Sequence, residues 1–280
     1  MKILTVLLAL LVATAALAQP APTTTPAASA DAAPFGLAAL AKVSDPGGEK
    51  ARGFLVKMIT ALGGKAYLSI STREEEGRSY SFYHGQPNST GNIYWRFWKY
   101  PDKDRTEWTK KRDVIQIING EKGFEITYKG TAPLEAQDLD AYLRNRRRSL
   151  EIVLREWLKD PRTVVLSLGP GIADRRMAEL VSIINTSNED LTLYIDPITW
   201  LPIESKYEWR DKDRYKNEEA ILYGGYRAVE GIQTPFTITS LHEGEISRQR
   251  FLNSVHYNTA IEDSKYDASV NYDPMRPQKK

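Results

Sequence analysis

The residues that could carry out nucleophilic, acid–base or metal chemistry are few and far apart in this sequence. The chain has no cysteine, and its 3 histidines, His84, His242 and His256, lack the short ligand spacings of zinc motifs. No serine lies in the Gly-x-Ser-x-Gly pattern of a nucleophile elbow, and the Gly-Pro-Gly run at 169–171 lacks the Lys-Ser/Thr pair of a phosphate-binding loop. We therefore expect no metal, no cofactor and no enzymatic activity, and we interpret the histidines as surface residues at strand ends.

The charged residues are numerous but balanced. Lys and Arg number 38 against 36 Asp and Glu, a net charge of +2, so the basic excess typical of nucleic-acid binding is missing. Acidic groups such as Glu74–Glu76, and the pair Glu204 and Glu208, are predicted to be solvated, as carboxylates on strand faces usually are. The basic runs Lys110–Arg112 and Arg144–Arg148 leave two interpretations open: docking to anionic lipid headgroups or an acidic partner, or a solvated face balanced by neighbouring acidic residues.

The first 44 residues differ in composition from the rest of the chain. Residues 1–18 combine Lys2, an apolar run and small residues before Gln19, the pattern of a cleavable secretory signal peptide. No cysteine follows, so we expect a periplasmic protein that is not lipidated. Residues 19–44 are rich in Pro, Ala and Thr and are expected to form a disordered leader. One folded domain over 45–266 and a polar C-terminal tail over 267–280 complete the expected organisation.

Two amphipathic helices are predicted in this domain. From Asp45 onward, apolar residues at helical spacing indicate a helix of about four turns that stops at the two glycines 63–64. A second helix is expected over 135–160, because Pro161 ends it. Each helix has an apolar stripe that must lie on another layer.

The rest of the domain is predicted to form strands. The stretch 191–210 is the clearest, because apolar and polar residues alternate on both sides of a turn that begins with Asp196 and Pro197. Pro202 then opens the second strand, where its missing N–H is tolerated. The other expected strands cover 65–73, 79–84, 92–100, 105–111, 114–118, 124–128, 163–168, 177–185, 215–223, 234–241 and 247–257. This order indicates one large antiparallel sheet with two helices packed on one face.

The strand 92–100 carries aromatic residues on both faces. Alternation places Trp95 and Phe97 on one face, and Tyr94, Trp98 and Tyr100 on the other. A strand that is apolar on both faces is covered on both sides, by a second layer, a lid or a ligand. A cavity wall and an ordinary core are therefore both open for this strand.

Several short motifs resemble those of the outer-membrane lipoprotein-sorting proteins, the LolA/LolB-like superfamily. They stand in the order found in that superfamily and, with the two helices, extend from Gly53 to Tyr266. The motifs are the run Pro101–Glu107, Asn119-Gly120 with Gly123-Phe124, Ile195-Asp196-Pro197 with Leu201-Pro202, Gly231-Ile232 with Pro235-Phe236, and Asn258 with Ile261, Asp263 and Tyr266.

This resemblance implies a mainly β (α+β) fold, an open, strongly curved antiparallel half-barrel of about 11–13 strands whose concave face is covered by two helices. In that superfamily the cavity receives acyl chains. The resemblance therefore implies a non-enzymatic carrier or binder of a lipid-like ligand, such as lipoprotein acyl chains in outer-membrane lipoprotein sorting, with membrane-associated donor and acceptor proteins as partners. The alternative is a periplasmic sensor or structural module of the same fold that binds a partner protein.

Apolar residues that share a face suggest where a ligand would lie. We expect Trp95 and Phe97 on the aromatic strand, and Leu143, Leu150 and Leu154 on the second helix, to line the cavity. Burial of hydrocarbon there would stabilise the complex by roughly 0.8 kcal/mol per CH₂.

Overall fold

The computed structural model describes residues 46–88 and 90–276. The expected signal peptide and leader, residues 1–44, lie outside this part of the chain. Within it, no helix is both long enough and apolar enough to cross a membrane.

Fourteen strands of the described chain form one open antiparallel sheet. The first group is β1 (Thr72–Tyr83), β2 (Gln86–Pro87), β3 (Asn92–Lys99), β4 (Lys103–Trp108), β5 (Val114–Asn119), β6 (Lys122–Thr127) and β7 (Gly130–Pro133). The second group is β8 (Val164–Ala173), β9 (Arg176–Ile184), β10 (Asp190–Ile195), β11 (Pro202–Arg210), β12 (Lys216–Val229), β13 (Ile232–His242) and β14 (Glu245–Tyr257). The mainly β, antiparallel character expected from the alternation is confirmed.

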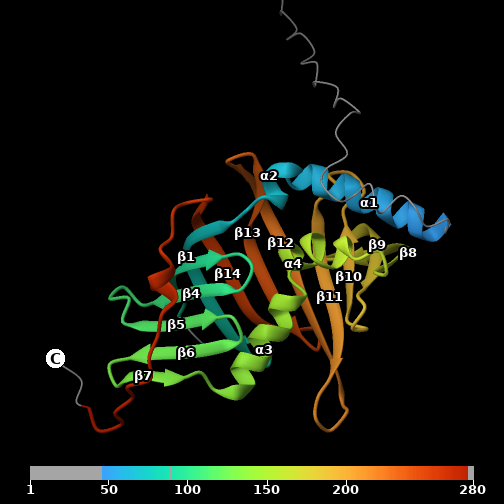
Figure 1. The fold of residues 1–280 in the computed structure, drawn as a ribbon. Coiled ribbons are helices and arrows are strands. Elements are labelled where there is room, and N and C mark those ends of the chain that lie inside the picture. Colours follow the sequence, from blue (N-terminus) through green and yellow to red (C-terminus); the bar gives the residue numbers. More distant parts are fainter. Residues whose placement is uncertain (1–45, 89, 277–280) are drawn as a thin grey trace, which may run out of the picture. The chain divides into compact units, whose positions relative to one another are not determined.

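The strand order explains why helices cross the sheet. The order is β7-β6-β5-β4-β3-β1-β14-β13-β12-β11-β10-β9-β8, with β2 paired to β1, so β7 and β8 form the two edges. These two strands are consecutive along the sequence. The segment between them must therefore travel from one edge to the other, and Figure 1 shows it doing so through α3 and α4.

The helices are α1 (Pro46–Leu62), α2 (Lys65–Leu68), α3 (Ala136–Arg147) and α4 (Leu150–Arg155), with 3-10 turns η2 (Trp157–Lys159) and η3 (Asp263–Tyr266). Two sequence predictions are corrected here. The second helix is not continuous, because Ser149 has an extended backbone and its Oγ accepts a hydrogen bond from the N–H of Ile152, so it caps a new helix. The strand expected from Lys65 begins with the short helix α2 instead, and β1 starts at Thr72.

One face of the sheet, which we call the inner face, is covered by α1 and α4. The two helices and the sheet share a single hydrophobic core. Leu55 and Met58 of α1, Val153 of α4, and Val181 and Leu193 of the sheet are all fully buried in it. Each such side chain contributes roughly 1.5–3 kcal/mol of burial free energy, so this core holds the helices on the sheet.

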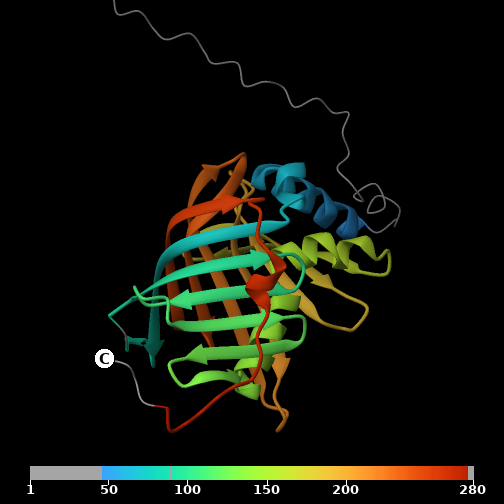
Figure 2. The same cartoon turned by 60° about the vertical axis from the view of Figure 1, so that its left-hand side comes forward.

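The opposite, outer face is partly covered by the C-terminal segment. Figure 2 shows this segment, in red, crossing the strands β4–β7 after β14. The backbone N–H of Asn271 donates to the carbonyl oxygen of Thr131 at 3.0 Å, and the Oδ1 of Asn271 accepts from the N–H of Thr131 at 2.7 Å. Part of the expected polar tail therefore pairs with the edge strand β7.

Candidate functional site

A cavity of about 200 Å³ lies on the inner face, between the α3–α4 segment and the strands β1, β3 and β12–β14. Part of its wall is apolar, and part is formed by arginine, glutamate and tyrosine side chains. The residues that line it are Leu62, Tyr67, Arg73, Glu75, Arg96, Trp98, Tyr142, Asn145, Arg146, Ser149, Leu150, Glu151, Ile221, Tyr223, Tyr226, Gln233, Thr234, Pro235, Ile238, Arg250, Leu252 and Tyr257.

Strand pairing brings the charged residues together. Arg73 and Glu75 are two residues apart on β1, so their side chains point to the same face. Across the ladder, Arg73 lies opposite Trp98 and Glu75 lies opposite Arg96 of β3. Arg250 reaches the same region from β14 on the other side of β1.

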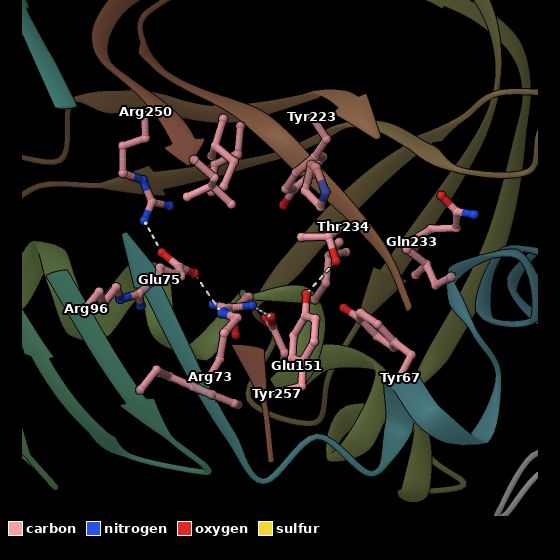
Figure 3. A pocket seen from close by; sticks show the side chains of 18 of the residues that line it. Tyr67, Arg73, Glu75, Arg96, Glu151, Tyr223, Gln233, Thr234, Arg250 and Tyr257 are labelled. Carbon is pink, nitrogen blue, oxygen red and sulfur yellow. Dashed lines mark hydrogen bonds and ion pairs between the residues drawn. The ribbon is translucent and has the colours of Figure 1, made fainter. Parts of the chain in front are cut away.

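These groups form a connected ionic network, drawn in Figure 3. The Oε1 atom of Glu75 lies 2.7 Å from Nε of Arg73 and 3.7 Å from Nη1 of Arg96, and its Oε2 lies 3.5 Å from Nη1 of Arg250. Nη1 of Arg73 also donates to Oε1 of Glu151, on α4, at 2.6 Å. The network therefore links the central strand β1 to the helix that covers it.

The ionisation of the two glutamates follows from this geometry. Burial alone would raise the pKa of Glu75, but the guanidinium groups of Arg73, Arg96 and Arg250 outweigh it and lower the pKa to about 2. For Glu151, burial likewise raises the pKa, and the charge of Arg73 more than compensates, so the pKa falls below its usual value. Both carboxylates are thus charged at neutral pH and cannot act there as proton donors.

Tyrosine hydroxyls form another polar part of the wall. The Tyr223 hydroxyl and the Ser205 hydroxyl lie 2.9 Å apart, and those of Tyr257 and Thr234 lie 2.8 Å apart. Burial raises the pKa of Tyr223, Tyr257 and Tyr67, so these hydroxyls stay protonated and uncharged. They can hydrogen-bond a ligand without adding charge to the cavity.

The apolar wall comes from helices and strands together. Leu62 belongs to α1 and Leu150 to α4, whereas Ile221, Ile238 and Leu252 come from β12, β13 and β14. A ligand in this space would contact hydrocarbon from these residues and charged or hydroxyl groups from β1, β3 and β14. The cavity wall is therefore amphipathic.

The structure separates the five residues that periodicity suggests for a cavity wall. Leu150 lines the cavity, and Leu154 is buried in the same core without lining it. Leu143 is buried on α3. Trp95 and Phe97 do share one face, but it is the outer face, so they do not join Leu150.

The C-terminal segment explains the position of the two aromatic residues. Phe97 packs in a second hydrophobic cluster with Ile117 and Tyr266, and Trp95 packs against this cluster. The Nζ of Lys265 lies 3.3 Å from the centroid of the Phe97 ring. Alternation could show that Trp95 and Phe97 point the same way, but not that the chain returns to cover that side.

Sequence reasoning missed the charged part of the cavity. Glu75 belongs to the run Glu74–Glu76, which is predicted to be solvated, yet only 4% of its surface is exposed. A signal was present in the sequence, since Arg96 interrupts an aromatic run and must point to the same side as Tyr94 and Trp98. Its acidic partner could not be inferred, because that depends on the β1–β3 register.

The basic run on α3 also differs from a simple solvated face. The guanidinium of Arg144 lies 3.5 Å from the ring centroid of Trp209, and Arg148 is buried. Arg147 and Arg148 both pair with Oε1 of Glu189, at 3.0 and 3.3 Å. Much of this run therefore serves to fix α3 on the sheet.

The histidines lie where the sequence predicts. His84, His242 and His256 are exposed at or near strand ends, and Nδ1 of His242 is 3.0 Å from Oε1 of Glu219. Across residues 46–88 and 90–276, no group of three or more His, Cys, Asp or Glu side chains is arranged to hold a metal ion.

No protein-family model matches the sequence, and no curated protein matches it. Solved structures are similar in fold. A DUF1329 family protein from Desulfovibrio piger has 8% identity and a TM-score of 0.55, and a domain named for outer membrane lipoprotein sorting from Vibrio parahaemolyticus has 9% identity and a TM-score of 0.52. Each comparison covers 78% of this chain and 97% of the other. The resemblance in fold to the lipoprotein-sorting proteins is therefore confirmed, together with the mainly β, antiparallel architecture but not with a strongly curved half-barrel, and identities this low establish the fold alone.

Proposed function

We propose that this chain is a periplasmic, non-enzymatic carrier or binder of a lipid-like ligand, such as lipoprotein acyl chains in outer-membrane lipoprotein sorting. The observation that carries the proposal is the cavity on the inner face, where Leu62, Leu150 and Leu252 supply an apolar wall. The likeness in fold to the Vibrio parahaemolyticus lipoprotein-sorting domain supports the same function. In this proposal the open sheet acts as a half-barrel, and α1 and the α3–α4 segment cover its inner face.

The physical basis is transfer of hydrocarbon from water. Each methylene buried against this wall would stabilise the complex by roughly 0.8 kcal/mol, so a few methylenes suffice for measurable binding. The cavity, at about 200 Å³, is smaller than the roughly 300–1,000 Å³ of most ligand pockets. It therefore accommodates one chain segment rather than a whole phospholipid, and Leu143 and Leu154 would border a larger space if α3 and α4 moved outward.

Export and partners complete the proposal. The sequence pattern of residues 1–18 would direct the chain to the periplasm, where a carrier meets a membrane-associated donor and passes its ligand to an acceptor. No catalytic group is needed for this task, because binding and release depend only on the relative affinities of donor, carrier and acceptor.

The test has two measurements on the purified chain. Mass spectrometry of an organic extract should detect bound lipid in proportion to protein, and the neutral fluorescent probe 1-N-phenylnaphthylamine should bind and be displaced by single-chain amphiphiles. If no lipid is extracted and the probe does not bind, the carrier proposal fails, and a module that binds a partner protein takes its place.

A further inference from the structure

We propose that the ligand carries one anionic head group and that Arg250 binds it. This inference rests on the proposed lipid-binding function and adds the chemical class of the ligand. It places the head group beside the ionic network and the hydrocarbon against the apolar wall.

The first observation is the charge of the lining. The cavity is lined by the guanidinium groups of Arg73, Arg96, Arg146 and Arg250 but by only two carboxylates, Glu75 and Glu151. Because acidic side chains behind the wall also pair with some of these arginines, the arginine that is least engaged by carboxylates decides which ligand charge the cavity favours.

The second observation is that three of these arginines have close acidic partners. Arg96 donates from Nε and Nη2 to the carboxylate of Asp104, at 3.0 and 2.6 Å. Arg146 donates to Oε1 of Glu121 at 2.6 Å. Arg73 lies between Glu75 and Glu151, as described above. The hydrogen-bonding capacity of these three groups is therefore largely directed at the protein itself.

Arg250 is different. Among the residues that the structure describes, its guanidinium makes no hydrogen bond, and its one ion pair is the 3.5 Å contact with Oε2 of Glu75. A guanidinium has five N–H donors in a planar fork that fits a carboxylate or a phosphate. The donors of Arg250 are thus available to a ligand that enters the cavity.

The surroundings of Arg250 extend the argument. Arg248 lies two residues earlier on β14, so it points to the same face, and within the described chain it has no hydrogen bond or ion pair. Beyond Arg250, Leu252 lies on the same face, and Ile238 is directly opposite Arg250 on β13. The inner face of β14 therefore changes from cationic to apolar within a few residues. This change is complementary to an anionic amphiphile, whose charged head group is followed by a hydrocarbon tail.

The positions of the lining side chains in Figure 3 indicate how such a ligand would be oriented. Arg250, Glu75 and Arg96 gather at one side of the cavity, while Tyr67, Thr234 and Gln233 lie at the other. A head group on Arg250 would leave the first methylenes of the tail between Leu252 and Leu150. The carboxylate of a fatty acid and the phosphate of a single-chain alkyl phosphate share the required chemistry, and competing amphiphiles can separate them.

The experiment is displacement of bound 1-N-phenylnaphthylamine from the full chain at pH 7.5 by decanoate, decyl phosphate and decanol. We expect at least one anionic compound to displace the probe at a concentration tenfold or more below that of decanol, a difference of about 1.4 kcal/mol. The stronger of the two anions identifies the source of the head group. In Arg250→Met the advantage of the anions over decanol should disappear, while decanol itself displaces the probe within twofold of the wild-type concentration.

A matched control tests whether the effect belongs to this position. Arg78 lies on the outer face of β1, because it is three residues from Glu75, and it is exposed. Arg78→Met removes the same charge from the neighbouring strand and should leave the preference for anions unchanged. If Arg250→Met does not fold, Arg250→Gln keeps a polar side chain there and should lose the same preference.

The outcomes are distinguishable. If decanol displaces the probe from the wild type as well as both anions do, or if the Arg250 variants keep the preference, the head-group inference is wrong while the lipid-binding function stands. If the probe does not bind the wild type and no lipid is extracted from it, both proposals fail.

Discussion

Leu150 and Phe97 allow a sharp test of which side of the aromatic strand faces the ligand. Their exposed fractions are nearly equal, 7% and 8%, so burial alone predicts a similar cost for replacing either by asparagine. Their surroundings differ. Leu150 borders the cavity, whereas Phe97 packs against Ile117 and Tyr266 under the C-terminal segment.

The expected magnitudes follow from these surroundings. Leu150→Asn loses about 2 kcal/mol of burial free energy, but its amide can meet water in the cavity. Phe97→Asn loses about 3–5 kcal/mol on truncation of the ring. It also buries an amide without a partner, which costs about 1–3 kcal/mol more. We therefore expect Phe97→Asn to be the more destabilising substitution by several kcal/mol.

Probe binding should show the opposite order. Leu150→Asn should remain folded by circular dichroism and bind 1-N-phenylnaphthylamine at least tenfold more weakly, since it places a polar group on the apolar wall. Phe97→Leu, a milder change that keeps the cluster apolar, should lower the free energy of unfolding in urea and leave probe affinity within twofold. A folded Leu150→Asn with normal affinity, or a folded Phe97→Leu with tenfold weaker binding, would refute the assignment of the two faces.

Three further changes test the ionic network, the central turn and the outer cluster. The pKa of Glu75 falls to about 2 on folding, so its stabilising effect is complete above its ordinary pKa and is lost as pH falls from about 4.5 to about 2. The loss of unfolding free energy is at most about 3 kcal/mol. Glu75→Gln should therefore show a flatter fall in unfolding free energy between pH 5 and pH 3 than the wild type. Asp196→Ala removes the Oδ1 acceptor of the N–H groups of Ile198 and Thr199, at 2.8 and 2.9 Å, and should cost about 1–2 kcal/mol in urea without changing probe affinity. Tyr266→Ala empties a fully buried site on the outer face and should lower the free energy of unfolding by about 3–5 kcal/mol, with normal probe binding in the folded fraction. If the free energy of unfolding falls by less than about 1 kcal/mol, the C-terminal segment does not stabilise the sheet.

The sequence by itself determined much of the local structure. Alternation at 191–210 predicts the hairpin β10–β11, and the turn residue Asp196 bonds the backbone ahead of it as its chemistry requires. The apolar stripe and the glycines 63–64 define α1. These features depend on neighbours within a few residues, so composition and spacing are sufficient to predict them. The break at Ser149 is also local, since serine is a strong helix N-cap, but the long apolar stripe obscured it.

Only the tertiary structure decided which residues form the site. The order of the sheet pairs β1 with β14, and this brings Arg250 to Glu75, 175 positions away in the sequence numbering. Alternation along a strand shows that Arg73 shares a face with Glu75, and that Trp95 shares a face with Phe97. It does not show which face borders a cavity, because both faces of these strands are covered. The α3–α4 crossover encloses one face and the C-terminal segment packs on the other, so contacts between distant parts of the chain made one set of side chains a cavity wall and the other a packed core.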